Sequence, residues 1–296
     1  MNEASKEITK LLQAYVDEQQ KHGHTPKIDE LNQFMQKKMD EQNSSPKEKF
    51  QGFSPDQMFK IINTPFEEGC PVQLRQLDDE VIREIPFMAQ ALFLMRLLDE
   101  KDLKLTAQGY IPPKIVTDIY ELGLRDWNTD YYRQKTEPRT EKVQVLRIAL
   151  NLCGFIKIRK GVMSLTAKGR KIQGDANALL DALMHFMFWD FNVACFDIFE
   201  DEDAANVGRA YSLWLLHHYG EEWRDMDFYA EKYLEAFPGF SPSMSHAYSY
   251  RTFNRLFSYI GICEINDTDE YRGAGFGRRT RKREILDKMF SFTEPK

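Results

Sequence analysis

Basic side chains gather in two short stretches of this 296-residue chain, where they could hold phosphate groups. The first stretch, residues 157 to 171, has no acidic residue and contains Lys157, Arg159, Lys160, Lys168, Arg170 and Lys171. The second contains Arg278, Arg279, Arg281, Lys282 and Arg283. Lys and Arg bind nucleic-acid phosphates regardless of base sequence. Both stretches are candidate phosphate-binding surfaces, but a lysine-rich hairpin edge that only prevents edge pairing, or a flexible basic segment, remains an alternative.

Polar side chains at helical spacing are candidates for contacts with base edges. Gln144, Arg147 and Asn151 share one predicted helix face, and the opposite face is apolar, with Val143, Leu146, Ala149, Leu150 and Cys153. A second predicted helix is expected to expose Arg251, Asn254 and Arg255 and to bury Tyr250, Phe253, Phe257 and Ile260. Arg, Asn and Gln can form bidentate hydrogen bonds with purines in the major groove. A merely solvated helix face is the alternative interpretation.

These side chains require helices followed by short hairpins to position them. Residues 146–158 (LRIALNLCGFIKI) and 253–265 (FNRLFSYIGICEI) each join an apolar-striped helix, a glycine and a short strand. Gly154 and Gly261 are expected to reverse the chain in a left-handed conformation. Two upstream helices are expected before each such helix, so that the predicted helices span residues 112–122, 127–133 and 140–152, and then 207–219, 228–236 and 246–260.

A resemblance to a known family covers part of this pattern. The phrase Gly-Phe-Ile followed by Leu-Thr-x-x-Gly, within residues 140 to 172, resembles the wing of bacterial winged-helix regulators. Residues 105 to 114 (LTAQGYIPPK) also resemble a phrase found in uncharacterised bacterial proteins. The resemblance implies winged-helix-like units, which serve in DNA binding and also purely in protein docking.

The expected architecture is mainly α-helical with small β-hairpins (an α+β fold), with tandem winged-helix-like units behind an N-terminal helical hairpin. Thr25 and Pro26 predict the N-cap and first residue of the second helix of that hairpin. The phrase Leu-Thr-Ala-x-Gly occurs at 105–109 and again at 165–169, which indicates an internal repeat. The predicted parts are a helical hairpin (1–42), a linker (43–50), a partial helix-plus-hairpin unit (51–110), a winged-helix-like unit (111–178) and an aromatic core helix with a C-terminal winged-helix-like unit (179–296).

Composition and motifs favour a soluble, non-catalytic protein. The net charge of −6 argues against indiscriminate coating of nucleic acid, and no apolar run reaches the about 20 residues needed to cross a bilayer. The opening residues lack the apolar core of a secretory signal, so the cytoplasm is expected. The four cysteines, far apart, are expected to be reduced thiols. The glycines at 273–277 lack the context of a P-loop, no metal or cofactor site is expected, and we predict no enzyme.

Two functions follow as expectations. The first is a DNA-binding protein or transcriptional regulator that contacts double-stranded DNA through Gln144, Arg147, Asn151, Lys157, Arg159, Lys160, Lys168, Arg170, Arg251, Arg255, Arg278, Arg279 and Arg281. The second is a protein-interaction module without nucleic acid. The acidic net charge and the aromatic segment 179–199 favour the second function, whereas the basic hairpins and the polar helix faces favour the first. The acidic run at 200–203 would favour docking if it neutralised the positive face. The aromatic segment 179–199 is expected to be a central core element or, alternatively, a surface for a protein partner or a homodimer.

Overall fold

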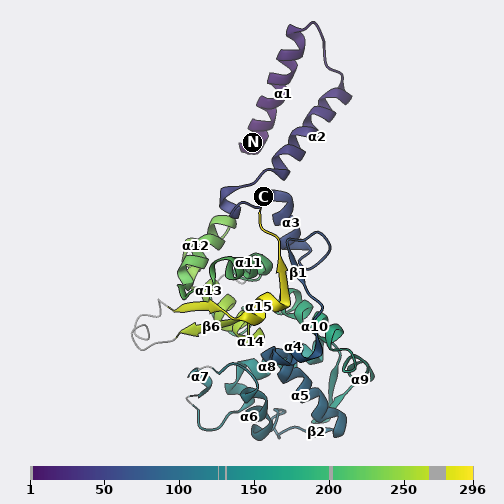
Figure 1. The fold of residues 1–296 in the computed structure, drawn as a ribbon, viewed down its shortest axis with the longest axis vertical. Coiled ribbons are helices and arrows are strands. Elements are labelled where there is room, and N and C mark those ends of the chain that lie inside the picture. Colours follow the sequence, from purple (N-terminus) through teal and green to yellow (C-terminus); the bar gives the residue numbers. More distant parts are fainter. Residues whose placement is uncertain (1–2, 126, 131, 200–202, 267–277, 296) are drawn as a thin grey trace. The chain divides into compact units, whose positions relative to one another are not determined.

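The computed structural model describes residues 3–125, 127–130, 132–199, 203–266 and 278–295. The chain forms two compact units: Met1–Phe59 with Pro295–Lys296, and Lys60–Glu294. The described helices and small antiparallel sheets (Figure 1) confirm the predicted mainly α, α+β fold class. The predicted glycines at 273–277 and residues 200–202 of the acidic run lie outside the described residues.

The smaller unit contains a helical hairpin formed by α1 (Glu3–Lys21) and α2 (Ile28–Ser44). The prediction that α2 begins at Thr25 and Pro26 is wrong: the N-cap is Lys27, in an extended conformation, and its backbone N–H donates to Glu30 Oε2 at 2.8 Å. Much of the predicted linker 43–50 is helical, because α2 continues to Ser44 and the 3₁₀ helix η1 spans Glu48–Phe50.

The larger unit contains a group of elements that we call the middle module. It comprises α5 (Pro86–Glu100), β2 (Leu103–Lys104), α6 (Pro113–Glu121), α7 (Trp127–Asp130), η2 (Glu137–Arg139), α8 (Glu141–Leu152), β3 (Ile156–Arg159), β4 (Val162–Leu165) and α9 (Ala167–Ile172). Its sheet has the order β2-β4-β3. The pairing of β2 with β4 crosses the predicted boundary at residue 110, so the partial unit and its neighbour share one sheet.

A second group, the C-terminal module, has a closely similar order of elements. It comprises α11 (Arg209–Tyr219), β5 (Arg224–Asp225), α12 (Met226–Ala236), η4 (Pro242–Met244), α13 (Ser245–Ser249), the π-helix η5 (Tyr250–Phe257), α14 (Ser258–Ile260), β6 (Cys263–Asn266), β7 (Arg279–Lys282) and α15 (Glu284–Met289). Its sheet has the order β5-β7-β6, antiparallel as in the middle module. Each module thus places a pair of antiparallel strands after its last long helical segment.

The remaining elements close the core of the larger unit. These are α3 (Pro55–Asn63), which begins in the smaller unit, β1 (Val72–Leu74), α4 (Asp79–Glu84), α10 (Ala176–His185), the π-helix η3 (Phe186–Asp190) and β8 (Phe290–Phe292). Strands β1 and β8 pair, so distant parts of the chain lie side by side (Figure 1). The predicted aromatic helix 179–199 ends by residue 190, and most of its large apolar side chains are buried inside the unit.

The two modules are in close contact where the backbone at Gly261 approaches the first residue of α5, Pro86. Gly261 ends α14 with φ of +94°, and a Cβ atom there would lie 2.4 Å from Pro86 Cγ at the start of α5. Only glycine fits both the left-handed conformation and this contact. Gly154, after α8, also has a positive φ, of +75°, as the sequence predicts.

Candidate nucleic-acid interface

A tight turn presents the basic residues of the middle module. Strands β3 and β4 are joined by the two residues Lys160 and Gly161, because Arg159 pairs with Val162. Both turn residues have positive φ, +49° and +74°, which is the pattern of a type I′ hairpin turn. Glycine suits this turn, whereas Lys160 is held in a conformation that lysine seldom adopts. The turn therefore projects Lys160 at the end of the hairpin.

The register of the sheet β2-β4-β3 adds a basic residue that the sequence analysis did not single out. Val162 pairs with Arg159 on one side and with Lys104 on the other, and Lys157 pairs with Ser164. Directly paired residues of an antiparallel sheet share a face, so Lys104, Lys157 and Arg159 lie on one side. These three side chains and Lys160 are exposed, and among the described residues none of the four forms an ion pair. We call Lys104, Lys157, Arg159 and Lys160 the basic face.

The opposite side of this sheet belongs to the core. Ile156, Met163 and Leu165 are almost fully buried, and β4 packs against α5. The alternation of buried and exposed residues along β3 and β4 therefore fixes which side faces solvent. Leu103 and Leu105 flank Lys104, and this alternation of apolar and charged residues is a local signal for a strand. The strand partner of Lys104, Val162, lies 58 positions away (162 − 104), so local pattern cannot identify it.

Two predicted phosphate ligands near the hairpin are engaged within the chain. Lys168 Nζ donates to the carbonyl of Cys153 at 2.8 Å and lies over the ring of Phe155. Arg170 Nε lies 3.1 Å from Asp99 Oδ1, in an exposed ion pair. Exposed pairs of this kind contribute little to stability, but they offset the charge that a phosphate would meet.

The polar stripe predicted on α8 is only partly available. Arg147 Nη1 donates to both oxygens of Glu137, at 2.7 and 2.9 Å, and to the carbonyl of Gly109 at 3.0 Å. Glu137 is itself buried, so this pair connects α8 to η2 rather than to solvent. Asn151 is exposed, whereas Gln144 is half-buried and faces a cleft. Leu152, next to Asn151, keeps 67% of its surface exposed.

The prediction that Arg251 and Arg255 face solvent is wrong. Their exposed fractions are 0% and 1%. Arg251 forms a bidentate pair with Asp197, at 3.0 and 2.8 Å, and Arg255 lies 2.8 Å from Asp197 and 2.5 Å from Glu141. Both arginines lie in the π-helix η5, whose wider turns do not follow the 3.6-residue spacing from which the exposed face was predicted.

This buried group of charges is balanced. Two arginines meet two carboxylates, and Tyr259 donates a further hydrogen bond to Glu141 at 2.6 Å. Burial would raise the pKa of Asp197, but hydrogen bonds from Arg251 and Arg255 outweigh it and hold that pKa below its usual value. The sequence gives no indication of these partners, because Asp197 and Glu141 lie 54 and 114 positions from their arginines. The network joins the N-terminal end of α8 to η5.

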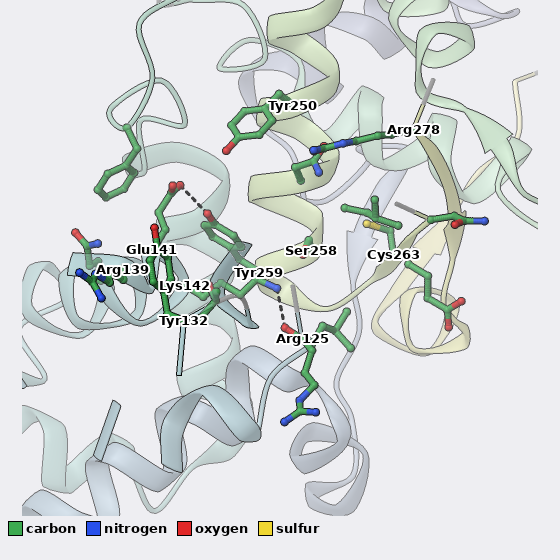
Figure 2. A pocket seen from close by; sticks show the side chains of 18 of the residues that line it. Arg125, Tyr132, Arg139, Glu141, Lys142, Tyr250, Ser258, Tyr259, Cys263 and Arg278 are labelled. Atoms are coloured by element: carbon green, nitrogen blue, oxygen red, sulfur yellow. Dashed lines mark hydrogen bonds between the residues drawn. The ribbon is translucent and has the colours of Figure 1, made fainter. Parts of the chain in front are cut away.

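A cleft of about 1280 Å³ lies beside this network (Figure 2). Its walls come from α7, η2 and α8 of the middle module and from η5, α14 and β6 of the C-terminal module. Lys142 Nζ donates to the carbonyl of Leu124 at 2.7 Å, and Arg139 lies over the ring of Tyr132. Burial raises the pKa of Cys263, on the same wall, to about 12, so this thiol stays protonated and is a poor nucleophile.

Three of the five cations in the basic stretch of the C-terminal module pair with carboxylates. Arg279 pairs with Asp225 at 3.3 Å, and Arg281 pairs with Glu264 at 2.8 Å and lies over the ring of Trp223. Lys282 pairs with Glu221 and Asp287, at 2.6 and 2.8 Å. Arg283 donates to the carbonyl of Gly261, and Arg278 lines the cleft. Although residues 278–283 are rich in Lys and Arg, most of these side chains are already engaged within the chain and do not form an open cationic surface.

Comparison with protein-family models, with curated proteins and with solved structures finds no match for this chain. Across the described residues, no helix is both long enough and apolar enough to span a membrane. The same residues contain no group of three His, Cys, Asp or Glu side chains placed to hold a metal ion.

Proposed function

We propose that the protein binds double-stranded DNA, without catalysis, through the basic face of the middle module. One observation carries this proposal: Lys104, Lys157, Arg159 and Lys160 are exposed on one small sheet without an ion pair to any described residue. Unpaired cations on a rigid sheet bind phosphates at low cost, because no internal ion pair has to break first. The resemblance of residues 140 to 172 to the wing of winged-helix regulators supports the same proposal.

The contact would be confined to this part of the surface. The net charge of −6 opposes broad electrostatic attraction to DNA, so the affinity has to come from the local cluster. Asn151, exposed on the last turn of α8, is then the candidate for a base contact, and adenine is the base that Asn recognises bidentately. Arg147, held by Glu137, is not proposed for that role.

The salt dependence of binding tests this proposal. Replacing Lys104, Lys157, Arg159 and Lys160 together with Ala removes up to four phosphate contacts. The slope of log affinity against log salt should then flatten by up to about 3.6, at about 0.9 per contact. The measurement is a fluorescence-anisotropy titration of a labelled duplex at several salt concentrations, with circular dichroism to verify the fold.

A matched control changes the net charge by the same amount at residues that already have acidic partners: Arg83, Lys232, Arg279 and Lys288, all to Ala. This control should keep a slope close to that of the unmodified protein. If the two four-residue variants lose binding equally, only total charge matters and the basic face is not a site. If the unmodified protein binds no duplex even at low salt, the DNA proposal fails.

A protein-interaction module is the second candidate, and the surface of α8 favours it. Ile148 and Leu152, one helical turn apart, are both exposed and flank Asn151. Exposed apolar side chains at this spacing are typical of a helix that docks on another protein. Failure of DNA binding together with capture of a protein that Leu152→Asp abolishes would support this candidate instead.

A further inference from the structure

Three polar side chains of the C-terminal module line the cleft without a hydrogen-bond partner. Tyr250, Asn254 and Ser258 occur at intervals of four residues along η5 and the start of α14, so they lie on successive turns of one helical face. None of these side chains forms a hydrogen bond with a described residue. Ser258 keeps only 7% of its surface exposed, and a hydroxyl so largely withdrawn from water normally has a partner. This row is therefore available to a ligand.

The unpartnered groups offer both donors and acceptors. Burial raises the pKa of Tyr250, so its hydroxyl stays protonated at neutral pH and can donate a hydrogen bond. Figure 2 shows this hydroxyl pointing into the cleft. Asn254 and Gln144, the latter on α8, each carry an amide with donors and an acceptor, and the Gln144 amide also has no hydrogen bond with a described residue. A ligand that carries both kinds of group, such as a nucleic-acid base, matches this set.

The other wall of the cleft, from the middle module, supplies a stacked arginine. The guanidinium of Arg139 lies 4.6 Å from the centroid of the Tyr132 ring, is exposed, and forms no ion pair with a described residue. Stacking covers one face of the guanidinium but leaves the N–H groups at its edge available, and that edge matches two oxygens of a phosphate. Arg125, on the same wall, pairs with Glu121 in an exposed contact that water screens. This wall can therefore hold an anion.

The charge and the aromatic lining of the cleft favour the same class of ligand. Among its described lining residues, four are cations and two are carboxylates, Glu141 and Glu264, which pair with Arg255 and Arg281 outside the lining. The local charge therefore attracts an anion. The aromatic lining residues, on which a base can stack, are Tyr132, Phe196, Trp223, Tyr250 and Tyr259. The volume of about 1280 Å³ exceeds the ~300–1,000 Å³ of most small-molecule sites, so a ligand with a base and a phosphate fits.

We propose that the cleft binds a nucleoside phosphate, whose phosphate contacts Arg139 and whose base lies against Tyr250, Asn254 and Ser258. A free nucleotide and a nucleotide unit of a single strand offer this same chemistry. The ligand would contact both modules, so its binding should stabilise the larger unit. No residue of the basic face lines the cleft, so this site is separate from the one proposed for duplex DNA and does not depend on it.

Calorimetric titration of the full chain tests the proposal. The probes are adenosine, guanosine, cytidine and uridine monophosphate, their nucleosides, ribose phosphate, and a short single strand of deoxythymidine nucleotides. We expect at least one monophosphate or the strand to bind with a dissociation constant below about 1 mM. The corresponding nucleoside and ribose phosphate should each bind at least about 10-fold more weakly, because each lacks one of the two contacts. Binding of the strand without the monophosphates would identify a single strand as the source.

Removal of the unpartnered hydroxyls locates the ligand in the cleft. Tyr250→Phe/Ser258→Ala breaks no hydrogen bond within the chain, so it should leave the free energy of unfolding unchanged while it weakens nucleotide binding by about 10-fold or more. The control Tyr110→Phe/Ser291→Ala removes two hydroxyls outside the cleft and should bind like the unmodified protein. Urea unfolding measures the stability of both variants.

A second pair of variants tests the phosphate contact. Arg139→Gln removes the stacked cation and should abolish the preference for a nucleotide over its nucleoside. Arg133→Gln changes the net charge equally at a nearby exposed residue that does not line the cleft, and it should retain this preference. Circular dichroism verifies that both variants are folded. An unchanged preference in Arg139→Gln would show that the phosphate lies elsewhere, which overturns the proposal.

The remaining results also decide the proposal. If neither a monophosphate nor the strand binds below about 1 mM, or if Tyr250→Phe/Ser258→Ala binds normally, the cleft is not a nucleotide site. If ribose phosphate binds as tightly as the nucleotide, or if the four Ala substitutions of the basic face abolish nucleotide binding, the proposal also fails. Should the variant without the two hydroxyls fail to fold, Arg139→Gln still decides. Loss of duplex binding alone would leave the cleft proposal untouched.

Discussion

The two modules share an order of elements but use their basic residues in opposite ways. In the middle module, Lys157 and Arg159 on β3 have no ion-pair partner among the described residues. In the C-terminal module, Arg279 and Arg281 on β7 pair with Asp225 and Glu264. The difference shows that a dense run of arginines does not by itself indicate a binding surface. What matters is whether the neighbouring strands supply carboxylates.

The long helical segment before each hairpin shows the same contrast. In the middle module α8 is a regular helix, and its Arg147 keeps part of its side chain at the surface. In the C-terminal module η5 is a π-helix, and Arg251 and Arg255 are fully enclosed. Arg255 of η5 joins the two modules through Glu141, whereas α8 retains an exposed last turn. Three predictions test this contrast, from the largest expected effect to the smallest.

Removing a buried arginine should be far more damaging in the C-terminal module. Arg255→Met leaves Asp197 with one partner and Glu141 without its arginine, and breaking a buried pair in this way costs about 3–5 kcal/mol. Arg147→Met, in the middle module, breaks one ion pair instead of two, and the buried Glu137 keeps the backbone N–H of Ile111 as a donor, so this change should cost less, about 1–3 kcal/mol. Urea unfolding of both variants measures the free energies. Equal losses would mean that the two arginines play equivalent roles.

Acid should weaken the C-terminal module through Asp197. Its folded pKa is lowered, because hydrogen bonds from Arg251 and Arg255 outweigh the effect of burial. A carboxylate with a depressed folded pKa contributes stability above its unfolded pKa of about 3.9 and loses it as pH falls through the folded value. At pH 6 the unmodified protein should therefore have a larger free energy of unfolding than the variant Asp197→Asn. This difference in free energy should become smaller below about pH 4. A difference that does not change with pH would exclude this role for the carboxylate.

Substitutions at the two residues of the type I′ turn in the middle module should affect stability differently. Gly161→Ala places a Cβ at φ of +74° and should cost about 1–2 kcal/mol. Lys160→Asn suits the left-handed conformation and should not destabilise the hairpin, while it removes one cation and flattens the salt slope by about 0.9. Thermal unfolding and duplex titration of both variants provide the check. Destabilisation by Lys160→Asn would contradict the assigned turn.

Local patterns in the sequence were sufficient for much of the fold. The apolar periodicity of residues 140–152 and the glycine after it predicted α8 and its hairpin, and both are confirmed. The site was less predictable because its decisive partners are remote. Lys104 joins the basic face through strand pairing, and Arg255 is buried by Asp197 and Glu141. Periodicity also assumes 3.6 residues per turn, and η5 departs from it.

The pairing of β1 with β8 has a consequence for synthesis. Val72 is aligned with Phe292, so β1 has no sheet partner until a segment 220 positions later (292 − 72) has been made. At ~5–20 residues per second this wait lasts roughly 10–45 s on the ribosome. During this interval, chaperones or other chains can bind the unpaired edge of β1 and the apolar surface that β8 later covers. The larger unit therefore completes its folding late, and the yield of native protein should respond to translation speed.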